Sequence, residues 1–239
     1  MKKAIVKKIC IVTTSEEKFF TPSFLKYCLA KKKLNIEIVF VPGFLNLKKI
    51  VYMILMLNFK EIFEVFFLKI FKKKDNYKCK KHHFKSINNQ KFYKFINKSN
   101  FDLLVSYNCN QIFKEKTLKK INCDIVNFHP GLLPKYKGVF PNYYSLKNKE
   151  SFIGITFHII EKKIDSGKII KKLKIRINAN DTIFKLYKKI FLNKQSHKFM
   201  YGCILNYKKL IKYKFENTNF YKYYTYPKLI DVIKFKFTL

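Results

Sequence analysis

The chain has 239 residues, a length that suits one domain or one domain with a short appendage. Apolar residues make up 48% of the chain and aromatic residues 18%, which excludes disorder of the chain as a whole. Its 51 basic and 15 acidic residues give a net charge of +36, yet Arg176 is the only arginine. Since proteins read base edges mainly with the planar arginine fork, this charge argues against base-specific nucleic-acid recognition.

The composition is typical of a genome rich in A and T codons. Lys, Asn, Ile, Phe and Tyr are abundant, whereas the chain has six glycines, six prolines and no tryptophan. We attribute most of the positive charge to this bias. The rest of the charge would attract anionic partners through its long-range field.

The cysteines and the amino-terminal residues indicate a cytoplasmic protein. Six cysteines lie far apart without a C-x-x-C pair, so we expect reduced thiols. Lys7 and Lys8 interrupt the first apolar stretch, which therefore lacks the core of a signal peptide. This stretch is better suited to a first strand.

Residues 9–42 predict a β-α-β unit. Residues 9–13 form a short β-branched run, and a helical pattern follows through residues 24–29. A second apolar run at 36–42 closes the unit in the manner of parallel sheets.

Residues 44–71 are dominated by apolar side chains, with lysines at both ends. A membrane span needs about 18 unbroken apolar residues. Five polar residues interrupt this stretch: Asn58, Lys60, Glu61, Glu64 and Lys69. We predict a pair of amphipathic helices packed on the core, as an insertion at about 44–72. A surface-lying helix that makes peripheral membrane contact through 44–71 is the alternative.

The rest of the chain continues the alternation of strands and helices after a basic connector at 72–81. Apolar runs predict four strands, at 101–107, 124–129, 152–161 and 168–177. Helical patterns are present at 113–121 and from a capping Asp181 to about Lys212. This order predicts an α/β fold with an open, mostly parallel Rossmann-like sheet and helices on both faces.

We assign residues 1–190 to one catalytic domain, with residues 191–239 packed on it as a helix and an aromatic tail. Seven of the twelve glycines and prolines lie within residues 130–167, where they indicate unusual turns and close approaches of the backbone. Chemistry is expected here, because ligands of open α/β sheets bind outside the carboxyl ends of strands.

Three polar residues stand at this place. Asn127 and His129 lie on one face of the strand at 124–129, because side chains alternate along a strand. Asp165 lies in the turn between the last two predicted strands.

Three sequence segments carry a family resemblance. They are Asn127-Phe-His-Pro-Gly-Leu-Leu-Pro-Lys-Tyr-Lys-Gly138, Gly154-Ile-Thr-Phe-His158 and Ile164-Asp-Ser-Gly-Lys168. This ordered set resembles the formyltransferases that use 10-formyltetrahydrofolate, with their Asn-x-His, their Leu-Leu-Pro-x-x-x-Gly loop and their later Asp-x-Gly. The family includes phosphoribosylglycinamide, methionyl-tRNA and sugar N-formyltransferases. The resemblance covers roughly residues 9–190 and is best from 101 to 170.

The resemblance implies acyl transfer to an amine, catalysed by three side chains. Asn127 would donate an amide N–H to the developing oxyanion. His129 would donate to the same oxygen or move a proton, since histidine ionises near neutral pH. Asp165 would orient His129 or a water and help to take the proton from the attacking amine. No covalent enzyme nucleophile is needed.

The donor site is placed by similarity. In the family, the pterin enters a pocket between the segment before the Asn-x-His strand and the loop before the Asp. The corresponding residues here are Gln111, Ile112, Phe113, Leu118, Glu161, Lys162, Lys163 and Ile164. Apolar walls with backbone hydrogen bonds suit a flat heteroaromatic ring, and ordinary core packing is the alternative for Phe113 and Leu118. No metal site is expected, because His82, His83 and Cys79 lack a fourth ligand.

The acceptor amine is the least defined part. Phosphoribosylglycinamide enzymes cradle a phosphate in a glycine-rich turn after the first strand, and residues 13–20 contain no glycine. Methionyl-tRNA enzymes usually add a C-terminal barrel that the short tail cannot form. An amino sugar nucleotide, which is anionic and partly flat, suits the lysines and tyrosines of the tail at 221–227, and plain packing of the tail is the alternative for these aromatic residues.

Other functions and partners stay open. The same residues would deliver the formyl group to water in 10-formyltetrahydrofolate hydrolysis. A basic module that adheres to RNA or to an anionic membrane is the non-enzymatic alternative, and tRNA is a weaker partner candidate. A homodimer would cover the lysine-rich edge strand and the aromatic tail.

Overall fold

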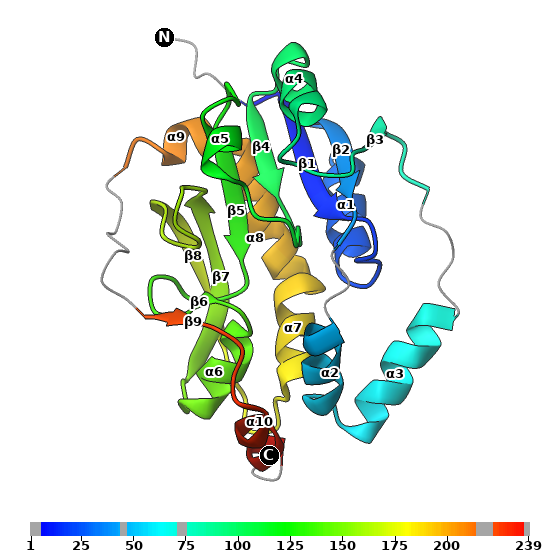
Figure 1. Cartoon of the computed structure of the whole chain (residues 1–239), viewed down its shortest axis with the longest axis vertical. Helices are drawn as coiled ribbons and strands as arrows, with labels where there is room; N and C mark the ends of the chain where they lie inside the picture. Colours follow the sequence, from blue (N-terminus) through cyan, green and yellow to red (C-terminus); the bar gives the residue numbers. More distant parts are fainter. Residues whose placement is uncertain (1–5, 44–46, 71–75, 214–221, 237–239) are drawn as a thin grey trace.

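A seven-stranded mixed sheet runs through the centre of the protein (Figure 1). The computed structural model describes residues 6–43, 47–70, 76–213 and 222–236. The sheet strands are β1 (Lys8–Thr14), β2 (Asn35–Val41), β3 (Lys81–His83), β4 (Leu103–Ser106), β5 (Ile125–His129), β7 (Phe152–Ile159) and β8 (Ile169–Arg176). Their order is β3-β2-β1-β4-β5-β7-β8, in which the four pairs from β3 to β5 are parallel and the last two pairs are antiparallel. The predicted mostly parallel α/β sheet is confirmed.

Helices cover both faces of the sheet, as expected. They are α1 (Thr21–Ala30), α2 (Leu47–Leu55), α3 (Phe59–Ile70), α4 (Gln90–Lys98), α5 (Glu115–Leu118), α6 (Pro141–Lys147), α7 (Ile183–Phe191), α8 (Lys194–Leu205), α9 (Tyr207–Leu210) and α10 (Leu229–Lys236). Helices α1, α7 and α8 share one core with the sheet, and α4 shares a second core on the opposite face.

The apolar run of β1 follows from this layering. Ile9 and Ile11 point into the core beneath α1, whereas Cys10 and Val12 point into the core beneath α4. A central parallel strand is buried on both faces and therefore lacks the alternation of a half-exposed strand.

Several elements were not predicted from the sequence, among them β3, α4, α6 and α10. Strand β3 has only three residues and begins at Lys81, which the sequence assigned to a basic connector. Helix α4 is lysine-rich, but Phe92 and Ile96 are buried on one face and the Asn89 side chain accepts from the Phe92 N–H at 2.8 Å. A short apolar stripe with a good cap is enough to form a helix on this surface.

The helix predicted from Asp181 to about Lys212 is divided into three, α7, α8 and α9. Thr182, not Asp181, caps α7 by accepting from the Lys185 N–H at 3.2 Å, whereas Asp181 accepts from the Asn178 N–H at 2.8 Å. Asn193 accepts from the Gln195 N–H at 2.7 Å and starts α8. Asparagine side chains compete with the backbone for hydrogen bonds and so favour helix starts over helix interiors.

Helices α2 and α3 occupy the predicted helical stretch, of which residues 44–46 and 71 lie outside the described residues, as do 72–75 of the connector. Packing on the core is confirmed for α2, through Tyr52 and Met56, but it is wrong for the phenylalanine face of α3, which is exposed. Among the described residues, no helix is both long and apolar enough to cross a membrane.

The described part of the tail, residues 222–236, begins near the middle of the molecule and ends in α10 at its lower end (Figure 1). Its short strand β9 (Tyr223–Tyr224) pairs in parallel with β6 (Lys137–Gly138). The Tyr52 hydroxyl donates to the Pro227 carbonyl at 2.7 Å, which ties the tail to α2. Residues 214–221 and 237–239 of the predicted tail lie outside the described part.

Candidate active site

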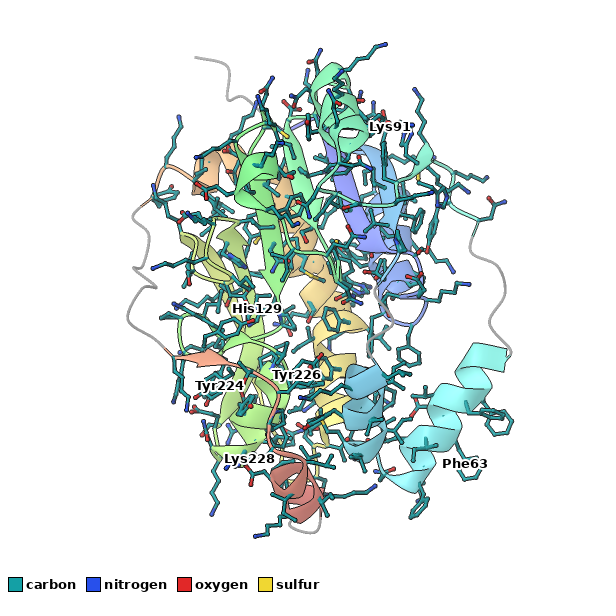
Figure 2. All side chains as sticks on the ribbon, viewed as in Figure 1. Phe63, Lys91, His129, Tyr224, Tyr226 and Lys228 are labelled. Carbon is teal, nitrogen blue, oxygen red and sulfur yellow. The ribbon has the colours of Figure 1, made fainter. Side chains whose placement is uncertain are left out.

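Strand β5 delivers Asn127 and His129 to its carboxyl end, on the same face, as their spacing predicts. Asn127 pairs across the sheet with His158 of β7, and His129 pairs with Thr156. His129 is 3% exposed, so its hydrogen bonds are made with the protein. Figure 2 shows His129 near the middle of the molecule, above Tyr224 and Tyr226 of the tail.

Asp165 joins these residues from the loop between β7 and β8. One of its oxygens, Oδ2, lies 3.4 Å from Nδ1 of His129 and accepts from the Gly138 N–H at 2.9 Å. The Asp165 backbone has a φ of 50°, a left-handed conformation that only a minority of non-glycine residues adopt. Backbone strain of this kind occurs often at functional sites, which agrees with a functional role for Asp165.

The imidazole of His129 is fixed at both nitrogens. Its Nε2 lies 2.6 Å from the Tyr136 carbonyl oxygen. Because a carbonyl oxygen only accepts, Nε2 carries the proton in this bond and Nδ1 is the nitrogen that faces Asp165. Of the two roles expected for His129, proton movement between Nδ1 and Asp165 is the one that this arrangement supports.

His158 orients the amide of Asn127. Its Nδ1 lies 2.8 Å from the Ile159 carbonyl oxygen and must donate there, while its Nε2 lies 3.2 Å from Nδ2 of Asn127. Burial lowers the pKa of His158 to about 4, and the adjacent His129 adds to this effect while Asp165 opposes it. A neutral His158 therefore accepts an N–H from Asn127, which assigns the nitrogen and the oxygen of that amide. The second N–H of Asn127 is left for a ligand.

The loop after β5 supports this geometry. Thr156 donates to the Gly131 carbonyl at 2.6 Å and accepts from the Leu133 N–H at 3.0 Å. A Cβ at Gly131 would lie 2.8 Å from Nε2 of His129, so only glycine permits the loop to pass this close. The glycine and proline cluster of the sequence thus holds the histidine ring.

Lys137 and His158 also belong to this site. The sequence gives Lys137 no role, whereas for His158 it leaves a supporting role and a direct role equally open. Lys137 is 3% exposed, and burial lowers its pKa against the opposing effect of the Asp165 carboxylate. Because the chain has fifty lysines, the sequence does not indicate that Lys137 is the one at the site. His158 was visible in the second motif segment, and its register opposite Asn127 required the sheet pairing.

The structure brings the two parts of the predicted donor site together. Glu115, just after the first segment, pairs with Lys162 of the loop at 2.7 Å. Two large apolar side chains are exposed here, Ile112 at 59% and Ile164 at 38%. Glu161 and Lys163 are also exposed.

Three residues of this set face the protein instead. Phe113 is buried in the core beneath α4, and Leu118 packs against the same core. The Gln111 side chain accepts from the Ile87 N–H at 3.0 Å and donates to the Pro42 carbonyl at 2.9 Å. Core packing is therefore the role of Phe113 and Leu118, and Gln111 braces two loops.

The expectation that no metal is bound stays a prediction. The described residues contain no group of three or more His, Cys, Asp or Glu side chains that could hold a metal ion. His82 instead pairs with the buried Glu37 at 2.8 Å. The helical pattern of the sequence predicts His197 on a helix surface. This prediction is wrong, since His197 is 4% exposed and donates to the Phe191 carbonyl at 2.6 Å.

Comparison with known proteins decides the family. Residues 63–203, more than half of the chain, match the family model described as formyl transferase. The chain belongs to the formyl transferase family. This match includes the Asn127, His129 and Asp165 positions and most of the sheet.

The relatives of this formyl transferase chain are diverse. The bifunctional polymyxin resistance protein ArnA of Wigglesworthia glossinidia brevipalpis is 36% identical over 127 residues, 53% of this chain and 19% of that protein. Methionyl-tRNA formyltransferases also match, among them that of Finegoldia magna, of which this chain spans 35%. The chain thus spans well under half the length of these curated relatives.

Solved structures share the fold. A sugar N-formyltransferase from a Shewanella species has 19% identity and a TM-score of 0.57, covering 94% of this chain and 78% of that one. WlaRD, a sugar 3N-formyl transferase solved with dTDP and 5-N-formyl-THF, has 21% identity and a TM-score of 0.54, covering 91% and 70%. Phosphoribosylglycinamide formyltransferases match similarly well.

Proposed function

We propose that this protein transfers the formyl group of 10-formyltetrahydrofolate to a primary amine on a small anionic acceptor, most simply an amino sugar nucleotide. The observation that carries the proposal is the convergence of Asn127, His129 and Asp165 at one rim of the sheet. Family membership supports the reaction class, and the surroundings of the site support the acceptor class.

The chain's own groups suit acyl transfer. The Asn127 N–H not used by His158 donates to the oxyanion that develops on the formyl carbonyl, where a fixed donor in a buried site lowers the barrier. Asp165 accepts the proton of the attacking amine, directly or through His129, whose Nδ1 faces it at 3.4 Å. Gly138 holds the carboxylate in place. The bond between the formyl carbon and the folate nitrogen then breaks, and that nitrogen takes up the proton held by Asp165 or His129 and leaves as an amine, so no enzyme nucleophile is required.

The donor site fits a flat heteroaromatic group. Ile112 and Ile164 expose apolar side chains on the two segments that Glu115 and Lys162 join. Exposed apolar surface next to a polar catalytic group is typical of a small-molecule site. We therefore assign the pterin to the surface between residues 112 and 164, and we do not assign it contacts with the buried Phe113.

The turn after β1 disfavours a phosphate in the position that phosphoribosylglycinamide enzymes use. The Glu17 carboxylate accepts from the backbone N–H groups of Phe19, Phe20 and Thr21 at 3.1, 2.8 and 2.6 Å. These N–H groups at the start of α1 are the ones that would bind an anion. Since the protein's own carboxylate already fills this place, a substrate phosphate would meet like charge there.

An anionic, partly aromatic acceptor fits the tail instead. An open pocket of about 370 Å³ is lined by four tyrosines, three lysines and Asp231, which pairs with one of the lysines, Lys147, and leaves Lys222 and Lys228 for an anion; the tyrosines are Tyr144, Tyr223, Tyr224 and Tyr226. It joins the catalytic site through Tyr136, whose ring stacks on Tyr224 with centroids 5.7 Å apart. Tyrosine rings with lysines suit a nucleotide base and its phosphates. Figure 2 shows Tyr224, Tyr226 and Lys228 following one another along the tail.

A panel of acceptors tests the proposal. The full chain is incubated with 10-formyltetrahydrofolate and a dTDP-linked amino sugar, glycinamide ribonucleotide, methionyl-tRNA or no amine, and tetrahydrofolate release is followed by absorbance. We expect release that depends on the amino sugar nucleotide and is lost in Asn127→Ala. Release without any amine would indicate hydrolysis. Transfer only to glycinamide ribonucleotide or to methionyl-tRNA would contradict the acceptor class, and equal rates for wild type and Asn127→Ala would contradict the catalytic assignment.

A further inference from the structure

Exposed apolar side chains gather at one end of the molecule, away from the catalytic site. Among the residues whose side chains the structure describes, seventeen large hydrophobic ones are more than a third exposed, and twelve of these lie on α2, α3 and α10. These helices lie together at the lower end in Figure 1, and α2 contacts α10. Soluble monomers seldom expose a contiguous apolar patch above a few hundred Å². We call the exposed face of these three helices the apolar end.

Helix α3 shows that this exposure is built into the fold. Phe59, Phe63, Phe66 and Phe67 recur at helical spacing on one stripe and are 53% to 79% exposed. Figure 2 shows Phe63 pointing away from the body of the protein.

The opposite side of α3 is polar and faces the protein. Glu61 is 5% exposed and accepts a hydrogen bond from Thr182, and Glu64 pairs with Lys188 of α7 at 2.9 Å. The helix is therefore docked by its carboxylates and presents its phenylalanines outward, the reverse of an ordinary surface helix.

The charged side chains that the apolar end exposes to solvent are lysines. Lys48, Lys60, Lys234 and Lys236 are exposed on the three helices. Their described carboxylates are engaged with the rest of the protein, since Asp231 pairs with Lys147 at 3.1 Å and the two glutamates of α3 bind α7. The face thus combines phenylalanines with lysines whose charge is not offset on the same surface.

We propose that the apolar end binds an anionic lipid surface, with α2, α3 and α10 lying in the plane of the headgroups. Helices of 9, 12 and 8 residues are too short to span a bilayer, for which about 20 residues are needed. Aromatic and aliphatic side chains on one face with lysines beside them are typical of helices that lie in the interface. A second copy of this chain fits the surface less well, because each copy carries a net charge of +36 and the lysines of the two faces would meet.

Cosedimentation of the full chain with vesicles tests the proposal. We expect binding to vesicles of phosphatidylglycerol and phosphatidylcholine, and weak binding to phosphatidylcholine alone. The triple variant Phe63→Ser, Phe66→Ser, Phe67→Ser should reduce the partition coefficient by about tenfold or more, because it removes three apolar anchors. The matched control, Phe152→Ser with Tyr213→Ser, changes exposed aromatic residues elsewhere and should bind as the wild type does.

A spectroscopic reporter keeps the test independent of the triple variant's folding. The chain has no tryptophan, so Phe63→Trp introduces a single tryptophan on α3, which can be excited at wavelengths that the tyrosines do not absorb. Its emission should shift to the blue when anionic vesicles are added, whereas that of Phe152→Trp should not. Equal binding of the triple variant and the wild type would overturn the proposal, as would equal binding to neutral vesicles or no shift at Phe63→Trp. A dimer in solution that the triple variant abolishes, without vesicle binding, would assign the surface to a second copy.

Discussion

One N–H of Asn127 is taken by the uncharged His158, so in the proposed mechanism the other N–H is the donor to the reacting carbonyl. The neighbouring contacts have the same character: His129 is held by the Tyr136 carbonyl and Asp165 by the Gly138 N–H. Each proposed catalytic group thus has at least one hydrogen bond that fixes it to the rest of the protein.

Replacing Asn127 by alanine should lower kcat by about 100- to 1000-fold, which is the usual loss when one oxyanion donor is removed. The KM for the amine should change little, because the ground-state carbonyl needs this donor less than the oxyanion does. Steady-state kinetics measure the split between kcat and KM. Lys91→Ala, at the far end of the molecule in Figure 2, is the control. A change confined to KM would show that Asn127 only binds substrate.

His158 should make stability depend on pH. Its folded pKa of about 4 lies below the value near 6.5 of an unfolded histidine, so the unfolded chain binds the extra proton between these values. The free energy of unfolding should therefore fall as the pH drops from about 6.5 toward 4, by roughly 1–3 kcal/mol from this group.

Urea unfolding of wild type and His158→Gln at pH 7, 5.5 and 4.5 checks this effect. The glutamine variant keeps an acceptor for Asn127 but cannot be protonated, so its pH dependence should be shallower. Burial also lowers the pKa of His197, which contributes equally to both proteins. Parallel pH curves for the two proteins would contradict the assignment.

Among the secondary-structure elements, the β6–β9 bridge decides whether the site is complete. It joins the tail to the loop after β5, and its Gly138 both pairs with β9 and donates to Asp165. This pairing therefore positions part of the proposed acceptor pocket and one residue, Asp165, of the proposed catalytic set.

Gly138→Ala should disturb both. Gly138 has a φ of 96°, and an added Cβ would lie 2.1 Å from the Tyr224 carbonyl oxygen, so the variant should lose about 1–3 kcal/mol of stability and most of its activity. Gly202→Ala is the matched control, because nothing lies within 4 Å of a Cβ there. In the interior of α8 it should add about 0.5–1 kcal/mol. Thermal unfolding and turnover are measured on both variants. If Gly138→Ala has the stability and turnover of the wild type, the β6–β9 bridge is not needed for the site.

At the scale of the whole molecule, self-repulsion works against the folded state. With a net charge of +36, the compact chain holds its lysines closer together than the unfolded chain does. Several exposed ion pairs, such as Lys119 with Glu115, offset little of this repulsion because exposed pairs are weak.

Raising NaCl should therefore raise Tm, since screening lengths fall from about 30 Å at 0.01 M to about 8 Å at 0.15 M salt. Thermal unfolding monitored by circular dichroism measures the shift. KCl at the same ionic strength should act equally, and a neutral osmolyte at the same osmolality serves to subtract solvent exclusion. A Tm that is flat or falls with salt would show that the lysines are already compensated.

Local sequence patterns predicted the central strands and the protein family. The continuous apolar runs predicted the central strands because strands buried on both faces need such runs. The ordered motif between Asn127 and Gly167 predicted the family, which the match over residues 63–203 shows. The sequence did not reveal β3 or α4, whose stabilisation by β2 and by the core depends on distant residues.

Only the tertiary structure decided which way side chains face and which partners they meet. The sequence placed His158 mid-strand, but its hold on Asn127 comes from antiparallel pairing of β5 with β7. The sequence showed four phenylalanines on α3, but the bonds of Glu61 and Glu64 to α7 turn them outward. Propensity and periodicity act over a few residues, whereas orientation at a site depends on contacts between segments far apart in the chain. That difference in range is why the chemistry could be named from the sequence and the positions of its supporting groups could not.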